Sequence, residues 1–130
     1  LRSRLFSDAM SVVMTKSKDR QMRAYVREQH RLYFGGFHST STLAQSYHAS
    51  ISSTVGHYSP AISLPTLMIG GKQDELGTEQ TQEELRSSFG QARLVMLERV
   101  GHLIHYEKAP ETANEIDRFL RSLGNQPQAV

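Results

Sequence analysis

The chain has 130 residues, of which 38% are hydrophobic, so it can form one small domain or part of a larger one. It contains no cysteine, which excludes a disulfide framework and a cysteine-ligated zinc site. No apolar run approaches the roughly 20 residues that cross a bilayer. We therefore expect no membrane span, no signal peptide and a cytoplasmic location.

The net charge of +2 conceals a difference between the two halves of the chain. Residues 1–60 carry eight Lys/Arg against three Asp/Glu, whereas residues 61–130 carry seven against ten. A basic half could attract an anionic substrate or nucleic acid. However, no run of five basic residues occurs, and aromatic residues do not alternate with basic ones. We expect solvated helix faces in this half and no nucleic-acid partner.

The first part of the chain is expected to form three helices and no strand. Apolar residues recur at a spacing of three to four over residues 1–13 and again over residues 22–33. A third pattern of this kind covers residues 43–55, and Thr40 or Ser41 can cap its start.

The later part of the chain alternates between strand and helix patterns. The apolar run 64–69 ends in a glycine pair, which predicts a strand buried on both faces. A capping-box pattern precedes a helix over 81–89, and residues 92–97 form the second strand candidate. A last helix is expected with Pro110 in its first turn and Gly124 at its end. This order predicts a parallel α/β unit.

Two polar loops follow the carboxyl ends of these predicted strands, which is where open α/β sheets bind ligands. Asp74 lies in the first loop and His102 in the second, 28 residues later. That separation leaves room for one helix and one strand, so we expect both side chains at the same edge of the sheet. A carboxylate beside an imidazole fixes its tautomer, and the other ring nitrogen can then act as a general base.

Residues 64–74 resemble the α/β-hydrolase strand that ends in Gly-x-x-Asp, whose aspartate is the acid of a catalytic triad. Residues 100–111 resemble the Gly-His-x-x-x-x-Glu loop of the same family, which supplies the triad histidine. The resemblance implies that Asp74 is the triad acid and His102 the catalytic histidine. Glu75 is an alternative acid, but the Gly-x-x-Asp spacing favours Asp74.

The resemblance is best over residues 60–123, and the residues before it are similar only in general character to the cap of the family. It implies the C-terminal part of an α/β-hydrolase parallel sheet preceded by a helical cap segment. We expect the cap at residues 1–59, the core at residues 60–124 and a tail at residues 125–130.

Two parts of the family pattern are absent from the sequence. The chain has no Gly-x-Ser-x-Gly nucleophile elbow and no His-Gly loop of the kind that lies near the oxyanion hole. Both belong to the first half of a family member. Because an unpaired apolar strand edge invites another strand, we expect a partner that completes the sheet. The simplest partner is the N-terminal half of the same hydrolase; the alternative is another chain.

The resemblance implies hydrolysis of a small apolar ester by a Ser-His-Asp triad whose nucleophile lies in a missing N-terminal part. It implies no metal and no organic cofactor. Two alternatives stay open: an acyltransferase of the same fold, and a non-catalytic small-ligand-binding protein or inactive fragment.

Other histidine and aromatic side chains are weaker candidates for the site. The remaining histidines are expected at the surface or in packing contacts: His30, His38, His48, His57 and His105. Five aromatic residues can line a pocket under the cap, although core packing is the commoner role for each: Tyr25, Tyr33, Phe34, Phe37 and Tyr47. Glu107 is expected to cap or brace the last helix.

Overall fold

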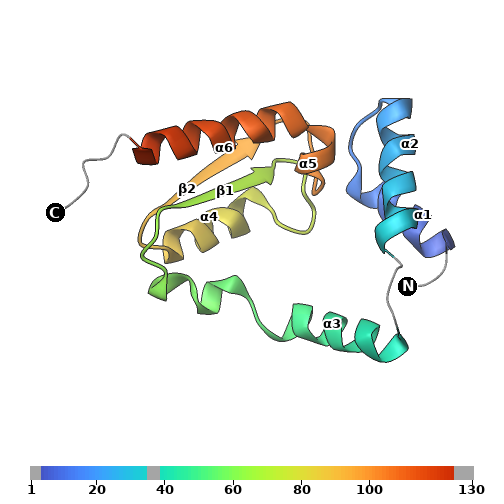
Figure 1. Cartoon of the computed structure of the whole chain (residues 1–130), viewed down its shortest axis with the longest axis horizontal. Coiled ribbons are helices and arrows are strands. Elements are labelled where there is room, and N and C mark those ends of the chain that lie inside the picture. The colour runs from blue at the N-terminus through green and yellow to red at the C-terminus, as the bar shows by residue number, and fades with distance from the viewer. Residues whose placement is uncertain (1–3, 35–38, 125–130) are drawn as a thin grey trace.

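The computed structural model describes residues 4–34 and 39–124 (Figure 1). The N-terminal elements are helical: α1 (Arg4–Met14), α2 (Arg20–Gln29), the π-helical turn η1 (His30–Phe34), α3 (Thr40–Ser52), and the 3₁₀ turns η2 (Val55–His57) and η3 (Ser59–Ala61). The elements that follow are β1 (Thr66–Gly71), α4 (Glu79–Ser88), β2 (Ala92–Leu97), α5 (Ile104–Glu107) and α6 (Ala109–Gly124). The expected order of strand, helix, strand and helix is confirmed.

The sheet consists of two parallel strands, as the sequence predicts. Their register runs from the pair Thr66 and Ala92 to the pair Gly71 and Leu97. Helix α4 connects the strands, and α4 and α6 lie on opposite sides of them (Figure 1). Both strands point toward α5 and the N-terminal helices, so the loops that follow β1 and β2 meet at that end of the molecule.

Strand β1 is less enclosed than its apolar sequence predicts. Residues 66–69 are half-buried, and only Gly70 and Gly71 at its end are buried. The reason is its place in the sheet: among the residues that the structure describes, β1 pairs only with β2. Its other edge carries no described strand. Strands of parallel sheets normally have neighbours that cover them, so β1 lacks part of the cover that its apolar sequence predicts.

Helix α3 is similarly uncovered. None of its residues is buried, and its apolar side chains Tyr47 and Ile51 are 59% and 63% exposed. It lies away from the sheet and from α1 and α2 (Figure 1). Neighbouring apolar side chains left in solvent on one helix mark a surface suited to contact with another surface.

Two helix starts differ from the predicted ones. Helix α4 is capped by Thr78, whose side chain accepts a hydrogen bond from the backbone N–H of Thr81 at 3.3 Å, so it begins two residues before the predicted capping box. Helix α3 is capped by Ser39, which accepts from Thr42 at 3.1 Å. In both regions more than one Ser or Thr could cap the helix start. The residue that does so is the one whose backbone is extended.

The first two helices pack against each other and against the histidine loop. The guanidinium of Arg31 donates two hydrogen bonds to the Asp8 carboxylate, at 2.8 and 2.6 Å, and Val26 is fully buried. Tyr25 on α2 meets Tyr106 on α5 edge to face, with ring centroids 5.7 Å apart. This contact places the N-terminal helices beside the carboxyl ends of the strands.

Across the described ranges, none of the helices combines the length and the apolar character that a bilayer crossing requires.

Candidate active site

Asp74 and His102 meet at the carboxyl ends of the two parallel strands. Asp74 follows β1, His102 follows β2, and His102 Nδ1 lies 3.0 Å from Asp74 Oδ2. The Asp74 side chain is 8% exposed, whereas the His102 side chain is 46% exposed. The carboxylate is therefore enclosed behind an imidazole whose other side remains accessible.

Backbone contacts hold the two loops together. The Lys72 N–H donates to Leu97 O at 2.9 Å, and the Gln73 N–H donates to Val100 O at 3.0 Å. The chains approach so closely that a Cβ on Gly71 would lie 2.2 Å from the carbonyl oxygen of Gly101. Glycine at position 71 is required for this approach, since any other residue would force the loops apart.

Hydrogen bonds keep the Asp74 carboxyl ionised. Burial raises its pKa. Hydrogen bonds from His102 and from the backbone amides of Leu76 and Gly77 lower the pKa, and together they outweigh burial, so the pKa lies below its usual value. The Leu76 N–H donates to Asp74 Oδ1 at 2.8 Å. An ionised carboxylate only accepts hydrogen bonds, so the proton of the shared bond belongs to His102 Nδ1. The neutral imidazole then presents Nε2 as a proton acceptor.

The histidine loop begins with a left-handed residue and lies against the N-terminal segment. Arg99 has φ = 55°, and the following Val100 is fully buried. A Cβ on Gly101 would lie 2.8 Å from Lys16 Cγ and 3.1 Å from the carbonyl oxygen of Met14. The end of α1 and the residues that follow it thus support the backbone next to His102.

Glu107 connects these same segments, which differs from its expected role at the last helix. Its carboxylate accepts hydrogen bonds from the backbone N–H of Lys16, at 3.2 Å, and of Ser17. The ammonium group of Lys16 in turn pairs with Glu75 at 2.7 Å. Of the two candidate acids, Asp74 therefore contacts His102, while Glu75 points to Lys16.

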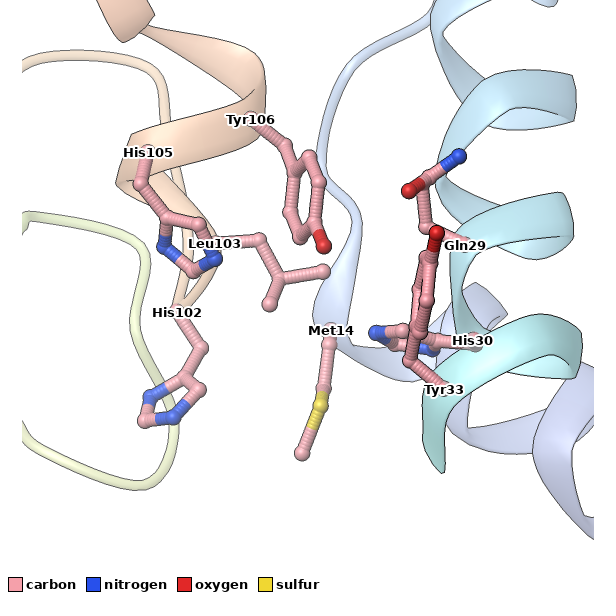
Figure 2. A pocket seen from close by; sticks show the side chains of 8 residues that line it. All are labelled: Met14, Gln29, His30, Tyr33, His102, Leu103, His105 and Tyr106. Atoms are coloured by element: carbon pink, nitrogen blue, oxygen red, sulfur yellow. The ribbon is translucent and has the colours of Figure 1, made fainter. Parts of the chain in front are cut away.

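A cavity of about 350 Å³ lies between the histidine loop and the N-terminal helices (Figure 2). His102 and Leu103 line one side of it, and Met14, His30 and Tyr33 line the other. A second hollow, of about 310 Å³, lies beside Asp74 and His102 along β1 and α4. The imidazole of His102 thus borders two spaces large enough for a small ligand or an inserted side chain.

Of the aromatic residues expected near a pocket, Tyr33 lines the cavity. Tyr25 packs on Tyr106, and Tyr47 stands exposed on α3. The side chain of Phe34 and the whole of Phe37 lie outside the described residues, as does His38.

His48, His57 and His105 are exposed, as expected for surface histidines. His30 is buried, as a packing role predicts, but both His30 and His105 also line the cavity, which the sequence does not predict. The place of His30 one helical turn after Val26, an apolar position of the same predicted helix, indicates a shared helix face, but nothing in the sequence indicates the cavity.

Residues 4–34 and 39–124 contain no group of three or more His, Asp or Glu side chains arranged to hold a metal ion.

No protein-family model matches the chain. A stretch of 57 residues, 44% of the chain, is 32% identical to Lipase 3 of Moraxella sp. (strain TA144) and covers 18% of that lipase. The structure is similar to a thermophilic esterase from Thermogutta terrifontis (TM-score 0.75, 19% identity) over 91% of the chain and 43% of the esterase. It is also similar to the enol-lactonase from Burkholderia xenovorans LB400 (TM-score 0.72, 23% identity) over 90% of the chain and 44% of that enzyme.

The chain spans less than half the length of these solved proteins and about a fifth of the lipase. Its fold is that of the C-terminal part of an α/β-hydrolase, as the sequence predicts.

Proposed function

We propose that the chain is the cap and C-terminal core of an α/β-hydrolase that hydrolyses carboxylic esters with a Ser-His-Asp triad. His102 is the general base and Asp74 is the acid that orients it. The observation that carries this proposal is the 3.0 Å contact between His102 Nδ1 and Asp74 Oδ2 at the carboxyl ends of two parallel strands. Esterases and an enol-lactonase among the similar structures support the reaction class.

In this mechanism His102 Nε2 takes the proton from a serine hydroxyl as the serine oxygen bonds to the ester carbonyl carbon. Asp74 stabilises the imidazolium that forms. The bond to the leaving alcohol oxygen then breaks, and His102 returns the proton to that oxygen. A water molecule attacks the acyl-serine in the same way, which releases the carboxylic acid and restores the serine.

The nucleophile comes from a polypeptide segment outside this sequence, which also completes the sheet at the uncovered edge of β1. The half-buried side chains of β1 and the exposed apolar face of α3 both require a covering surface. The length of the similar solved proteins, of which this chain spans less than half, supports a missing half of the same protein. The 310 Å³ hollow beside Asp74 and His102 provides the space into which the nucleophile is inserted.

The N-terminal helices act as the cap over the site. They enclose the 350 Å³ cavity against the histidine loop. Glu107, on the helix α5 that follows this loop, accepts hydrogen bonds from the backbone of the connection between α1 and α2. A cavity of this volume accommodates a small substrate.

The test is made on the complete protein, assembled from this chain and the segment that supplies a Gly-x-Ser-x-Gly elbow. His102→Ala should lower kcat for a chromogenic short-chain ester by about 10²–10⁴-fold or more, because the proton acceptor is lost. His57→Ala is the matched control, since this histidine is exposed and is not among the residues that line the cavity.

Full activity in His102→Ala would overturn the assignment. A complete protein that binds small ligands but hydrolyses no ester would identify the non-catalytic alternative. Transfer of the acyl group to an added alcohol in preference to water would identify the acyltransferase.

A further inference from the structure

A hollow of about 460 Å³ lies where the connection between α1 and α2 meets the histidine loop and the start of α6. Its described lining contains four cationic side chains, and we call it the basic hollow: Lys16, Lys18, Arg99 and Lys108. They come from three separate segments of the chain, namely the connection after α1, the loop after β2 and the junction of α5 with α6. The fold thus gathers cations that are far apart in the sequence.

The backbone that carries these cations is held in place. Arg99 adopts a left-handed conformation, with φ = 55°, and the next residue, Val100, is fully buried. Few residues other than glycine adopt this conformation, and those that do are held there by the surrounding structure. On the other side of the hollow, the backbone N–H groups of Lys16 and Ser17 donate to the Glu107 carboxylate.

The positive charge of the basic hollow is only partly compensated. Glu75 pairs with Lys16 at 2.7 Å, and Glu111 pairs with Lys108 at 2.8 Å.

Lys18 and Arg99 form no ion pair with any of residues 4–34 and 39–124. Glu107 is the carboxylate of the described lining, and it already accepts two backbone hydrogen bonds. Cations that face one hollow repel one another, and a lining of one charge sign attracts ions of the opposite sign. An anion between Lys18 and Arg99 would therefore offset the remaining repulsion.

We propose that the basic hollow binds the phosphate group of a small phosphate monoester. The bound phosphate fastens the connection between α1 and α2 to the histidine loop. A phosphate monoester carries a charge of about −1.5 to −2 at pH 7 and three acceptor oxygens, so it can contact cations from separate segments at once. The guanidinium of Arg99 can pair with two of these oxygens, and the Lys18 ammonium supplies a point charge. A volume of 460 Å³ also leaves room for the organic part of the ester.

This site is separate from the surfaces that the missing segment is proposed to cover. None of the four cations that line the basic hollow belongs to β1 or α3. Nor does the hollow share a described lining residue with the cavity beside His102. Phosphate binding therefore does not depend on the hydrolase function proposed above.

The test measures binding of glycerol 3-phosphate and inorganic phosphate to the complete protein by calorimetry at low ionic strength. Both should bind saturably. Lys18→Gln and Arg99→Asn should each weaken binding about tenfold or more, because each removes a charged hydrogen-bond donor. Asparagine is chosen at position 99 because it tolerates the left-handed conformation.

Two control variants separate a specific site from bulk charge. Lys18→Arg keeps the cation and should keep the affinity within about threefold. Arg121→Gln makes the same charge change as Lys18→Gln, in the last turn of α6 and outside the described lining, and should bind like the wild-type protein. Absence of saturable binding, or equal losses in Arg121→Gln and Lys18→Gln, would overturn the site.

The two probes also distinguish the source of the phosphate group. Glycerol 3-phosphate should bind more tightly, because the hollow also encloses its organic part, whereas equal or tighter binding of inorganic phosphate would overturn the assignment to a monoester. Hydrogen exchange at the amides of Lys16 and Ser17 tests the fastening. Saturating glycerol 3-phosphate should slow it about fivefold or more, and an unchanged rate would overturn that part of the proposal.

Discussion

The alignment of Asp74 with His102 depends on the absence of a side chain at Gly71. A Cβ at this position would lie 2.2 Å from the carbonyl oxygen of Gly101 and 2.5 Å from that of Val100. Both obstacles are backbone atoms, which no rotamer change can move aside. In Gly71→Ala the histidine loop must therefore retreat from β1 by about 0.8 Å before even a 3.0 Å contact is reached.

Gly71→Ala destabilises the fold in two ways. Overpacking of this kind costs about 1–3 kcal/mol. The hydrogen bond from Gln73 N to Val100 O, now 3.0 Å, stretches beyond hydrogen-bonding distance and adds about 1 kcal/mol. For a chain of this size about 1 kcal/mol corresponds to roughly 4 °C in Tm. Gly71→Ala should thus lower Tm by about 8–16 °C.

Gly90→Ala is the matched control, because a Cβ at that position meets nothing within 4 Å. Thermal unfolding followed by circular dichroism gives the two Tm values, and the NMR signal of the His102 Nδ1 proton reports its hydrogen bond to Asp74. We expect Gly71→Ala to lose both stability and this signal, and Gly90→Ala to keep both. A Gly71→Ala protein that melts within about 2 °C of Gly90→Ala would show that the histidine loop tolerates a Cβ at position 71.

Three further predictions concern the carboxylates of the site. Asp74→Asn should reduce kcat in the complete protein by about 10³–10⁴-fold with little change in KM, because an amide favours the wrong tautomer of His102; retained ester hydrolysis would point to another acid. The lowered pKa of Asp74 means that its stabilising effect is present at neutral pH and is lost as the pH falls below about 4. Urea midpoints measured from pH 6 to pH 2 should therefore fall more steeply in the wild-type protein than in Asp74→Asn, and parallel curves would contradict the assigned shift. Glu107→Gln should cost about 1–2 kcal/mol in urea unfolding, since two backbone amides lose a charged acceptor. Glu111→Gln loses only an exposed ion pair with Lys108 and should change the midpoint far less. Equal effects of the two changes would exclude the anchoring role of Glu107.

Short-range patterns in the sequence determined the elements and the central pair of the site. Residues 92–97 form a strand with the bounds that their apolar run predicts, whereas β1 begins two residues into the run 64–69 and extends through Gly70 and Gly71. The 28 residues between Asp74 and His102 hold one helix and one strand, and parallel pairing then brings the two loops to one edge. These features were predictable because hydrophobic periodicity, turn residues and the geometry of a parallel crossover act over a few tens of residues.

Which distant segments meet around that pair depends on tertiary packing, not on local sequence. Glu107 binds the backbone of Lys16, 91 residues earlier in the chain, and His30 faces the cavity of His102. Both depend on how the N-terminal helices dock on the histidine loop. Burial and shape complementarity between separate elements set that docking, and no local pattern along the chain records it.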